Sequence, residues 1–154
     1  KAPDRLACGC AGTQVRTLAQ EEAGQDAPAQ PGRLQNWPVQ LQLVPVRAPY
    51  FDGCDLLIAA DCTAYACGSF HADFIRGHVT LIGCPKLDRA DYEEKLTAIL
   101  MENNVRSITL TRMEVPCCGG LEYAARQAVE ASGKSIPMRV VTFMADGKLL
   151  PQDA

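Results

Sequence analysis

The chain has 154 residues, the size of one ordinary domain that can bury a hydrophobic core of its own. Its net charge of −3 gives no sign of the basic surface with which proteins bind nucleic acids or anionic membranes. No run approaches the roughly 18 consecutive apolar residues that a membrane-spanning helix needs. We therefore expect a single domain over residues 1–154, with neither a nucleic acid nor a membrane as its partner.

Near the N-terminus, glycines stand beside Cys8 and Cys10, and such glycines let a backbone wrap closely around a bulky inorganic group. Residues 13–22 have the pattern of a helix, with Thr13 as its N-cap. Residues 23–35 are rich in Ala, Gln, Gly and Pro, which is typical of an exposed connection. Apolar residues then alternate with polar ones over residues 39–43, which predicts a half-exposed strand, at an edge of the sheet or antiparallel to the others.

Four short apolar runs follow, at residues 56–60, 79–82, 105–110 and 139–143. Runs of this kind are typical of strands that are buried on both faces of a parallel sheet. Helical patterns lie between them: one capped by Asp88 or Asp91 and ending near Asn103, one from Gly119 to Ser132, and a shorter one over residues 70–75. The alternation predicts a three-layer α/β fold, in which a mostly parallel sheet has helices on both faces.

Cysteine is the residue type whose number is unusual for such a domain, with eight in the chain: Cys8, Cys10, Cys54, Cys62, Cys67, Cys84, Cys117 and Cys118. A secreted scaffold held by disulfides is one interpretation, but a domain of this size with strong apolar runs does not need such cross-links. In a reducing compartment, cysteines more often bind metals or carry out redox chemistry. We therefore expect a cytoplasmic protein whose cysteines have a chemical role.

Three of the cysteine sites follow predicted strands. Cys62, Cys84 and the Cys117–Cys118 pair each come after a separate apolar run. The loops after parallel strands emerge at one edge of the sheet, where ligands bind near the point at which strand order reverses. We therefore expect these thiols to meet at that edge, with Cys8 and Cys10 reaching it from the N-terminal segment. Cys54 and Cys67 suit positions that any small buried residue would fill, and we expect them not to be ligands.

Thiolates are soft ligands, which favours an iron–sulfur cluster, zinc or Cu(I) over hard cations. Structural zinc sites usually pair their ligands as Cys-x₂₋₄-Cys. This chain has Cys-x-Cys, single cysteines and a Cys-Cys pair, and these spacings suit a polynuclear centre better. The sequence therefore predicts an iron–sulfur cluster, with zinc, disulfides and buried structural thiols as the alternatives.

Several neighbouring residues are candidates for tuning such a cluster. Lys86 and Arg112 lie close to predicted ligands and would offset the negative charge of the thiolates, although solvated surface charges are the alternative for both. The helix that begins at Gly119 would direct its positive dipole end and its backbone N–H groups at the sulfurs.

Candidate catalytic residues are few. His71 is a candidate non-cysteine ligand or proton donor, with a structural hydrogen bond as the alternative. Glu114 and Asp61 flank predicted ligands and are candidate acids or bases, with capping or turn roles as the alternative.

Long segments of the chain also resemble a known family. They are Asn-Trp-Pro-Val-Gln-Leu at residues 36–41, Ala-Ala-Asp-Cys at 59–62, Phe-His at 70–71, Gly-Cys-Pro-Lys-Leu-Asp at 83–88 and Met-Glu-Val-Pro-Cys-Cys-Gly at 113–119. Together they resemble the 4Fe–4S ferredoxin-like iron–sulfur proteins of anaerobic bacteria and archaea. The segment Cys-Gly-Cys-Ala-Gly-Thr at residues 8–13 resembles that family's Cys-Gly-Cys-Pro-Gly-Ser, with Ala11 in place of the usual proline.

The resemblance covers about residues 6–144 and implies that Cys8, Cys10, Cys62, Cys84, Cys117 and Cys118 bind iron. Many members of the family also carry an N-terminal ferredoxin module, which this sequence lacks. The Cys-Cys-Gly element is similar to the cysteine-rich motif of heterodisulfide reductase subunits, so a larger or non-cubane cluster stays open beside a 4Fe–4S cluster.

The leading functional hypothesis is electron transfer in anaerobic metabolism, with a ferredoxin or a reductase as the redox partner. An enzyme that uses a larger or non-standard cluster to bind and reduce a small substrate is the second hypothesis, because six thiolates exceed the four of one cubane. A zinc- or thiol-based binding module is the third.

Overall fold

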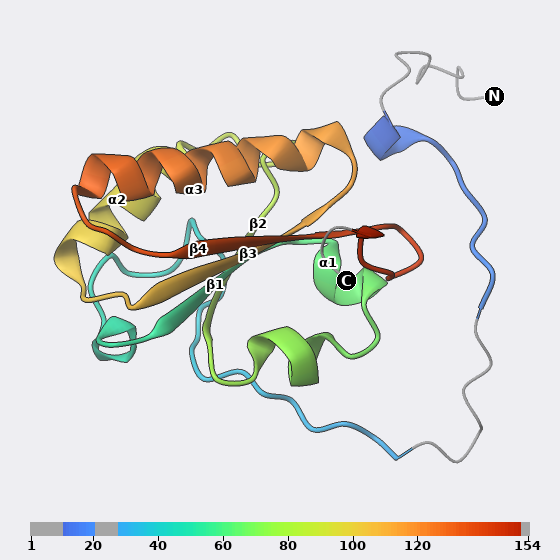
Figure 1. The fold of residues 1–154 in the computed structure, drawn as a ribbon, viewed down its shortest axis with the longest axis horizontal. Helices are drawn as coiled ribbons and strands as arrows, with labels where there is room; N and C mark the ends of the chain where they lie inside the picture. Colours follow the sequence, from blue (N-terminus) through green and yellow to red (C-terminus); the bar gives the residue numbers. More distant parts are fainter. Residues whose placement is uncertain (1–10, 21–27, 152–154) are drawn as a thin grey trace.

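The computed structural model describes residues 11–20 and 28–151, so Cys8 and Cys10 lie outside the described residues. The domain is built on a four-stranded sheet in the order β2-β1-β3-β4, in which every pairing is parallel (Figure 1). The strands are β1 (Asp55–Ala60), β2 (Val79–Gly83), β3 (Ser107–Met113) and β4 (Met138–Phe143). All four predicted buried strands are confirmed, and so is the mostly parallel sheet.

Helical elements cover both faces of this sheet, as expected of a three-layer α/β fold. The two long helices, α2 (Tyr92–Glu102) and α3 (Gly119–Ser132), pack together on one face (Figure 1). The other face carries the short α1 (Thr63–Ala66) and a π-helical turn, η3 (His71–Ile75). Right-handed crossovers explain this division, because the chain steps from β1 to β2 in one direction and then reverses to reach β3 and β4.

The core between the sheet and the long helices follows from the strand register. Leu56 and Ile58 of β1 pair with Ile108 and Leu110 of β3, which places all four side chains on one face. Each is at most 1% exposed, and burying one such side chain stabilises the fold by about 1.5–3 kcal/mol. The same cluster includes apolar side chains of the two helices: Leu96, Ile99, Leu100, Leu121, Ala125 and Ala128.

The ends of the long helices are where the sequence predicts them. The Asp91 side chain accepts a hydrogen bond from the Glu94 backbone N–H at 3.0 Å, which caps the start of α2. Gly133 ends α3 in the left-handed conformation at φ 70°, which favours glycine.

Two predicted elements are wrong. Of the helix expected over residues 13–22, the described part holds only a 3₁₀ turn, η1 (Ala11–Thr13), and residues 14–20 have no regular structure. Val15, on the predicted apolar face, is 98% exposed. A helix of this length is not stable in water without a surface against which to bury that face.

The strand expected over residues 39–43 is reduced to a single bridge between Gln40 and Ile82. It does lie at the edge of the sheet beside β2, and it is parallel. The Leu43 and Val44 N–H groups both donate to the Gln40 carbonyl at 2.9 and 3.0 Å, so the chain turns there instead of extending. The alternation therefore reflects a turn that buries Leu41 and exposes Leu43.

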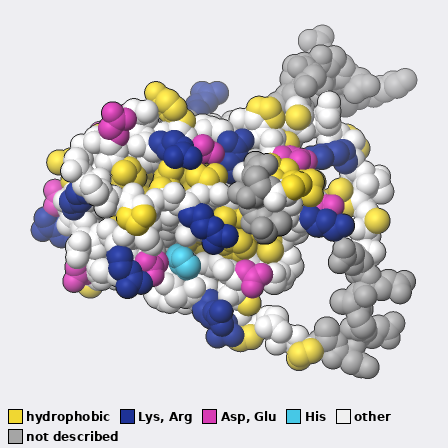
Figure 2. All heavy atoms as spheres, viewed as in Figure 1, with side chains coloured by type: hydrophobic (Ala, Val, Ile, Leu, Met, Phe, Trp, Pro, Cys, Tyr) yellow, Lys and Arg dark blue, Asp and Glu magenta, His cyan; other side chains and the backbone are white. Residues whose placement is uncertain are grey.

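The surface of the described residues is mixed in charge. Lys and Arg side chains lie among Asp and Glu side chains on the face that Figure 2 presents, with hydrophobic side chains between them. In the same part of the chain, no helix combines the length and the apolar character needed to cross a bilayer.

Candidate metal centre

The cysteines lie at the point where the strand order reverses. The chain leaves β1 toward β2 on one side and later returns to β3 on the other, so the strand order reverses between β1 and β3, the position at which parallel α/β sheets bind ligands. Cys62 follows β1, while Cys117 and Cys118 form part of η4 (Pro116–Cys118) after β3. Cys84 follows β2, the other neighbour of β1. The predicted placement of the cysteine loops at this edge is confirmed.

The four thiols are close enough to act on one another electrostatically. Burial raises the pKa of the Cys62 thiol, and Cys84, Asp61 and Cys117 raise it further by charge repulsion. Burial likewise raises the pKa of Cys118, with Cys117 and Cys62 adding to it, while a backbone hydrogen bond at Met113 and the charge of Arg112 oppose it. The thiols of three separate loops therefore lie within electrostatic reach of one another.

In the part of the chain that the structure describes, no group of three or more His, Cys, Asp or Glu side chains is placed so that it could hold a metal ion. Thiolates that share one zinc ion each lie about 2.3 Å from it, which draws their sulfurs tightly together. Thiolates of an iron–sulfur cluster bind different iron atoms and are spaced more widely. An iron–sulfur cluster at these cysteines stays a prediction.

A buried pair of hydroxyls holds the turn that carries Cys62. Thr63 Oγ1 donates to the Ala60 carbonyl at 2.8 Å and therefore accepts a hydrogen bond from Thr111 Oγ1, 3.0 Å away. Both threonines are fully buried. Because Thr111 belongs to β3, this contact ties the loop after β1 to the neighbouring strand.

Tyr92 holds the loop that carries Cys84. Its hydroxyl oxygen accepts a hydrogen bond from the Cys84 backbone N–H at 3.0 Å and donates to the Asp88 carboxylate. Gly83 makes room for this contact, because a Cβ at position 83 would lie 2.7 Å from the tyrosine hydroxyl. The sequence predicts Tyr92 only as an apolar residue of the helix and not as a support of the Cys84 loop. The feature of the sequence that is linked to this support is Gly83, which leaves room for the tyrosine hydroxyl.

The turn with Cys117 and Cys118 leads directly into α3. Cys118 is the N-cap of this helix, but its side chain makes no capping hydrogen bond, so the first N–H groups and the positive dipole end of α3 lie beside the cysteines. A Cβ at Gly120 would lie 3.3 Å from Pro85, which shows that this turn touches the loop after β2. Gly119 opens the helix as predicted, and its Cα faces the Arg112 guanidinium.

The two candidate cations have different positions. Arg112 is half-buried beneath the turn, where it bonds the Val115 carbonyl and pairs with Glu122 at 3.3 Å. Its charge acts on Cys118, so it lies within electrostatic reach of the thiols. Lys86 is exposed in the turn of residues 85–87, next to Cys84.

The described N-terminal residues reach the same edge. The η1 turn packs against η4, and Arg16 pairs with Glu114 at 3.3 Å. Cys8 and Cys10 lie outside the described residues, so their participation stays a prediction. Glu114 is exposed and makes an ion pair, and its role as an acid or base stays a prediction.

The cysteines that we expect not to be ligands lie elsewhere. Cys54 precedes β1, at the opposite end of the strand from Cys62, and burial followed by repulsion from Asp55 raises its pKa to about 11. Cys67 is buried at the end of α1, with its sulfur 3.8 Å from the Ser69 hydroxyl.

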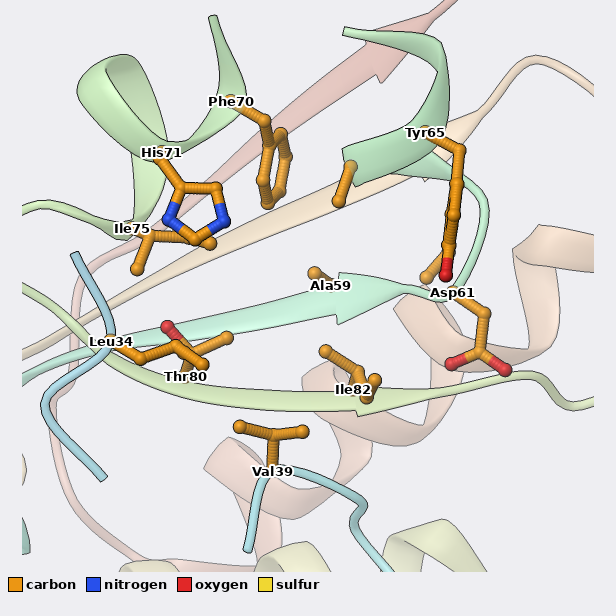
Figure 3. A pocket seen from close by; sticks show the side chains of 12 residues that line it. Leu34, Val39, Ala59, Asp61, Tyr65, Phe70, His71, Ile75, Thr80 and Ile82 are labelled. Atoms are coloured by element: carbon orange, nitrogen blue, oxygen red, sulfur yellow. The ribbon is translucent and has the colours of Figure 1, made fainter. Parts of the chain in front are cut away.

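His71 does not lie among the cysteines. Its Nδ1 accepts a hydrogen bond from the Arg33 backbone N–H at 3.0 Å, so the structural alternative for this histidine holds. The ring lines a cavity on the face of the sheet opposite α2 and α3, which Asp61 borders at the end of β1 (Figure 3).

Comparison with known proteins agrees with this fold. The parallel sheet and the ligand-binding edge define a Rossmann-like protein, and the pattern of the Rossmann-like domain family matches residues 48–154, so the chain belongs to that family. An uncharacterized protein of Archaeoglobus fulgidus is 31% identical over 119 residues, which are 77% of this chain and 84% of that protein. No solved structure matches the chain significantly.

Proposed function

We propose that the chain binds an iron–sulfur cluster through Cys62, Cys84, Cys117 and Cys118, together with Cys8 and Cys10, and transfers electrons in the cytoplasm of an anaerobe. The observation that carries this proposal is the convergence of thiols from three strand-end loops at the reversal of strand order. The resemblance to the 4Fe–4S ferredoxin-like proteins, whose motifs contain these same cysteines, supports it further.

A bound cluster supplies reversible electron transfer, and the surrounding residues would set its potential. The raised pKa values of Cys62 and Cys118 mean that these thiols keep their protons until a metal replaces them. Arg112 and the start of α3 then place positive charge beside the negative thiolates, which stabilises the reduced cluster.

Exposed apolar side chains beside the cysteines support docking of a redox partner such as a ferredoxin or a reductase. Tyr65 is 93% exposed three residues after Cys62, and Leu87 is 79% exposed three residues after Cys84. Aromatic side chains such as tyrosine are enriched at protein interfaces.

A second candidate is an enzyme that uses a larger or non-cubane cluster to bind and reduce a small substrate. Two observations favour it: the number of candidate thiolates exceeds the needs of one cubane, and a cavity borders Asp61 next to Cys62. The two candidates share the same centre and differ in whether a small molecule reaches it.

Purification without oxygen tests the centre itself. We expect a brown protein with broad absorption near about 400 nm, and with iron and acid-labile sulfide in comparable amounts per chain. A colourless protein that contains zinc and no iron would exclude both candidates and leave the zinc-based binding module as the remaining hypothesis. If iron is present, a change in the EPR signal of the reduced cluster on addition of a small ligand separates the enzyme from the carrier.

A further inference from the structure

A cavity of about 390 Å³ lies on the face of the sheet that α2 and α3 leave uncovered (Figure 3). Ala59 of β1 and Thr80 and Ile82 of β2 form one side of it. Val39 closes it from the segment that runs beside β2, and His71 closes it from η3. The size is that of a pocket for a small organic molecule.

Hydrogen bonds build this cavity from the adjoining segments. Buried Asn36 accepts a hydrogen bond from the Thr80 N–H at 2.8 Å and donates to the Thr80 carbonyl at 2.9 Å. The Ile82 N–H donates to the Val39 carbonyl at 2.8 Å, and the Arg33 N–H donates to His71. Four attachments therefore hold the segment of residues 33–39 over the sheet.

Two residues that line the cavity hold buried polar atoms without partners in the described part of the chain. Thr80 is 2% exposed and Asp61 has a buried carboxylate oxygen, yet neither Thr80 Oγ1 nor Asp61 Oδ1 has a hydrogen-bond partner among the described residues. Buried polar atoms are nearly always paired, because leaving one unpaired destabilises the fold. Both atoms belong to residues that line this cavity.

His71 adds a hydrogen-bond donor, its Nε2–H group. Because Nδ1 accepts a hydrogen bond from Arg33, the neutral ring carries its proton on Nε2. One ring nitrogen is turned toward the middle of the cavity in Figure 3. The site thus combines apolar walls with an N–H donor, a hydroxyl and a carboxylate.

We propose that this cavity binds a small, mostly apolar molecule that carries an amine or a hydroxyl group. Among the described residues that line the cavity, Asp61 is the one acidic residue, and none is a lysine or an arginine. A ligand that donates a hydrogen bond, cationic or neutral, is therefore favoured, and an anion is repelled. Thr80 and the Nε2–H of His71 would bond the same polar group or a second one. No cysteine is among the described residues that line the cavity, and Asp61 lies next to Cys62 in the sequence.

Three probes of one shape test the charge preference: benzylamine, benzyl alcohol and benzoate. They are titrated into the whole chain as purified, with iron measured in the same sample, while NMR follows the backbone amides. Probes of this size bind with roughly millimolar affinity. We expect benzylamine to bind most tightly and benzoate most weakly, with the shifts centred on Ala59, His71 and Thr80. Equal or tighter binding of benzoate, shifts centred elsewhere, or no shift with any probe overturns the proposal.

Two variants identify the contacts. Asp61→Asn should weaken benzylamine about tenfold and change benzyl alcohol much less, since the charge is lost and the shape is kept. Thr80→Val should weaken both while leaving the unfolding temperature unchanged or higher, because its hydroxyl has no partner to lose. Thr97→Val is the matched control: its hydroxyl bonds the Glu93 carbonyl within α2, on the other face of the sheet, so the same substitution there should leave binding intact. Unchanged binding in Asp61→Asn and Thr80→Val excludes this cavity as the site.

Discussion

The two ends of the sheet are built on different principles. At the amino ends of the strands, charged groups are paired: Asp55 accepts hydrogen bonds from Arg106 and from the Ser107 hydroxyl, the latter at 2.6 Å. At the carboxyl ends, thiols from three loops act on one another electrostatically, and Asp61 has a buried oxygen without a partner among the described residues.

A lysine continues the pairing at the amino end. Lys134 Nζ donates to the carbonyls of Leu100 at 2.7 Å and Asn103 at 3.0 Å, which satisfies carbonyl groups at the end of α2. The comparison shows that one end stabilises the domain while the other holds groups that a ligand would complete, which is where a functional site is expected.

Removal of single cysteines gives the largest expected difference between the ends. We expect Cys117→Ala and Cys118→Ala, at the carboxyl end, to lose most of the bound iron, because each removes a predicted ligand. Cys54→Ala, at the amino end, should keep it. Iron per chain after anaerobic purification is the measurement. The same iron content in all three variants would refute the ligand assignment.

Gly83→Ala tests how tightly the cysteine edge is packed. The added Cβ would lie 2.7 Å from the Tyr92 hydroxyl, which would break the contact that holds Cys84. We expect a loss of about 2 kcal/mol in the free energy of unfolding, measured with urea. Gly68→Ala is the control, because nothing lies within 4 Å of its added Cβ. Equal stability of the two variants would show that Tyr92 moves aside freely.

Lys134→Met tests the paired end directly. The variant keeps most of the apolar side chain but removes the ammonium that bonds the end of α2, so we expect a loss of about 1 kcal/mol in stability. Lys148→Met removes an equal charge elsewhere and should change stability by less than about 0.5 kcal/mol. Iron binding should be the same in both. Thermal and urea unfolding provide the measurement.

Asp55→Asn should have the smallest effect, and that effect should depend on pH. The hydrogen bonds from Arg106 and Ser107 lower the pKa of Asp55 from 3.8 to about 2. A carboxylate whose pKa is lower in the folded state stabilises the protein at pH values above its unfolded-state pKa. This stabilisation is lost as the pH falls through the folded-state pKa. The variant should therefore be less stable than the parent by up to about 1 kcal/mol at pH 7, since water screens the pair, and the difference should disappear below about pH 2. A difference that persists at the acid limit would contradict this assignment.

Much of the fold could be predicted because its signals are local. The apolar runs around Ile58 and Leu110 identify buried strands, and Asp91 and Gly133 mark helix ends through contacts within a few residues. The predictions failed where the local pattern did not match the packing. The stretch after Thr13 has the period of a helix but exposes Val15, and Leu41 and Leu43, which alternate with polar residues like a strand, lie in a turn. The periodicity of apolar residues does not indicate which apolar stretch will pack against another part of the molecule.

The candidate site could be predicted in part for a related reason. Parallel strands send their following loops to one edge, so the placement of Cys62, Cys84 and Cys118 follows from the order of strands and helices. Their supports could not be predicted, because Thr63 meets Thr111 across 48 residues and Tyr92 meets Cys84 only after α2 has packed.

By itself, the sequence determined the strands, the ends of the long helices and the loops that carry the cysteines, since these depend on near neighbours along the chain. Only the tertiary structure decided that Thr80, Asp61 and His71 line one cavity, and that Thr80 and Asp61 each hold a buried polar atom without a partner among the described residues. Those features arise from segments far apart in sequence, whose meeting depends on how the layers pack and on the direction in which the chain crosses the sheet.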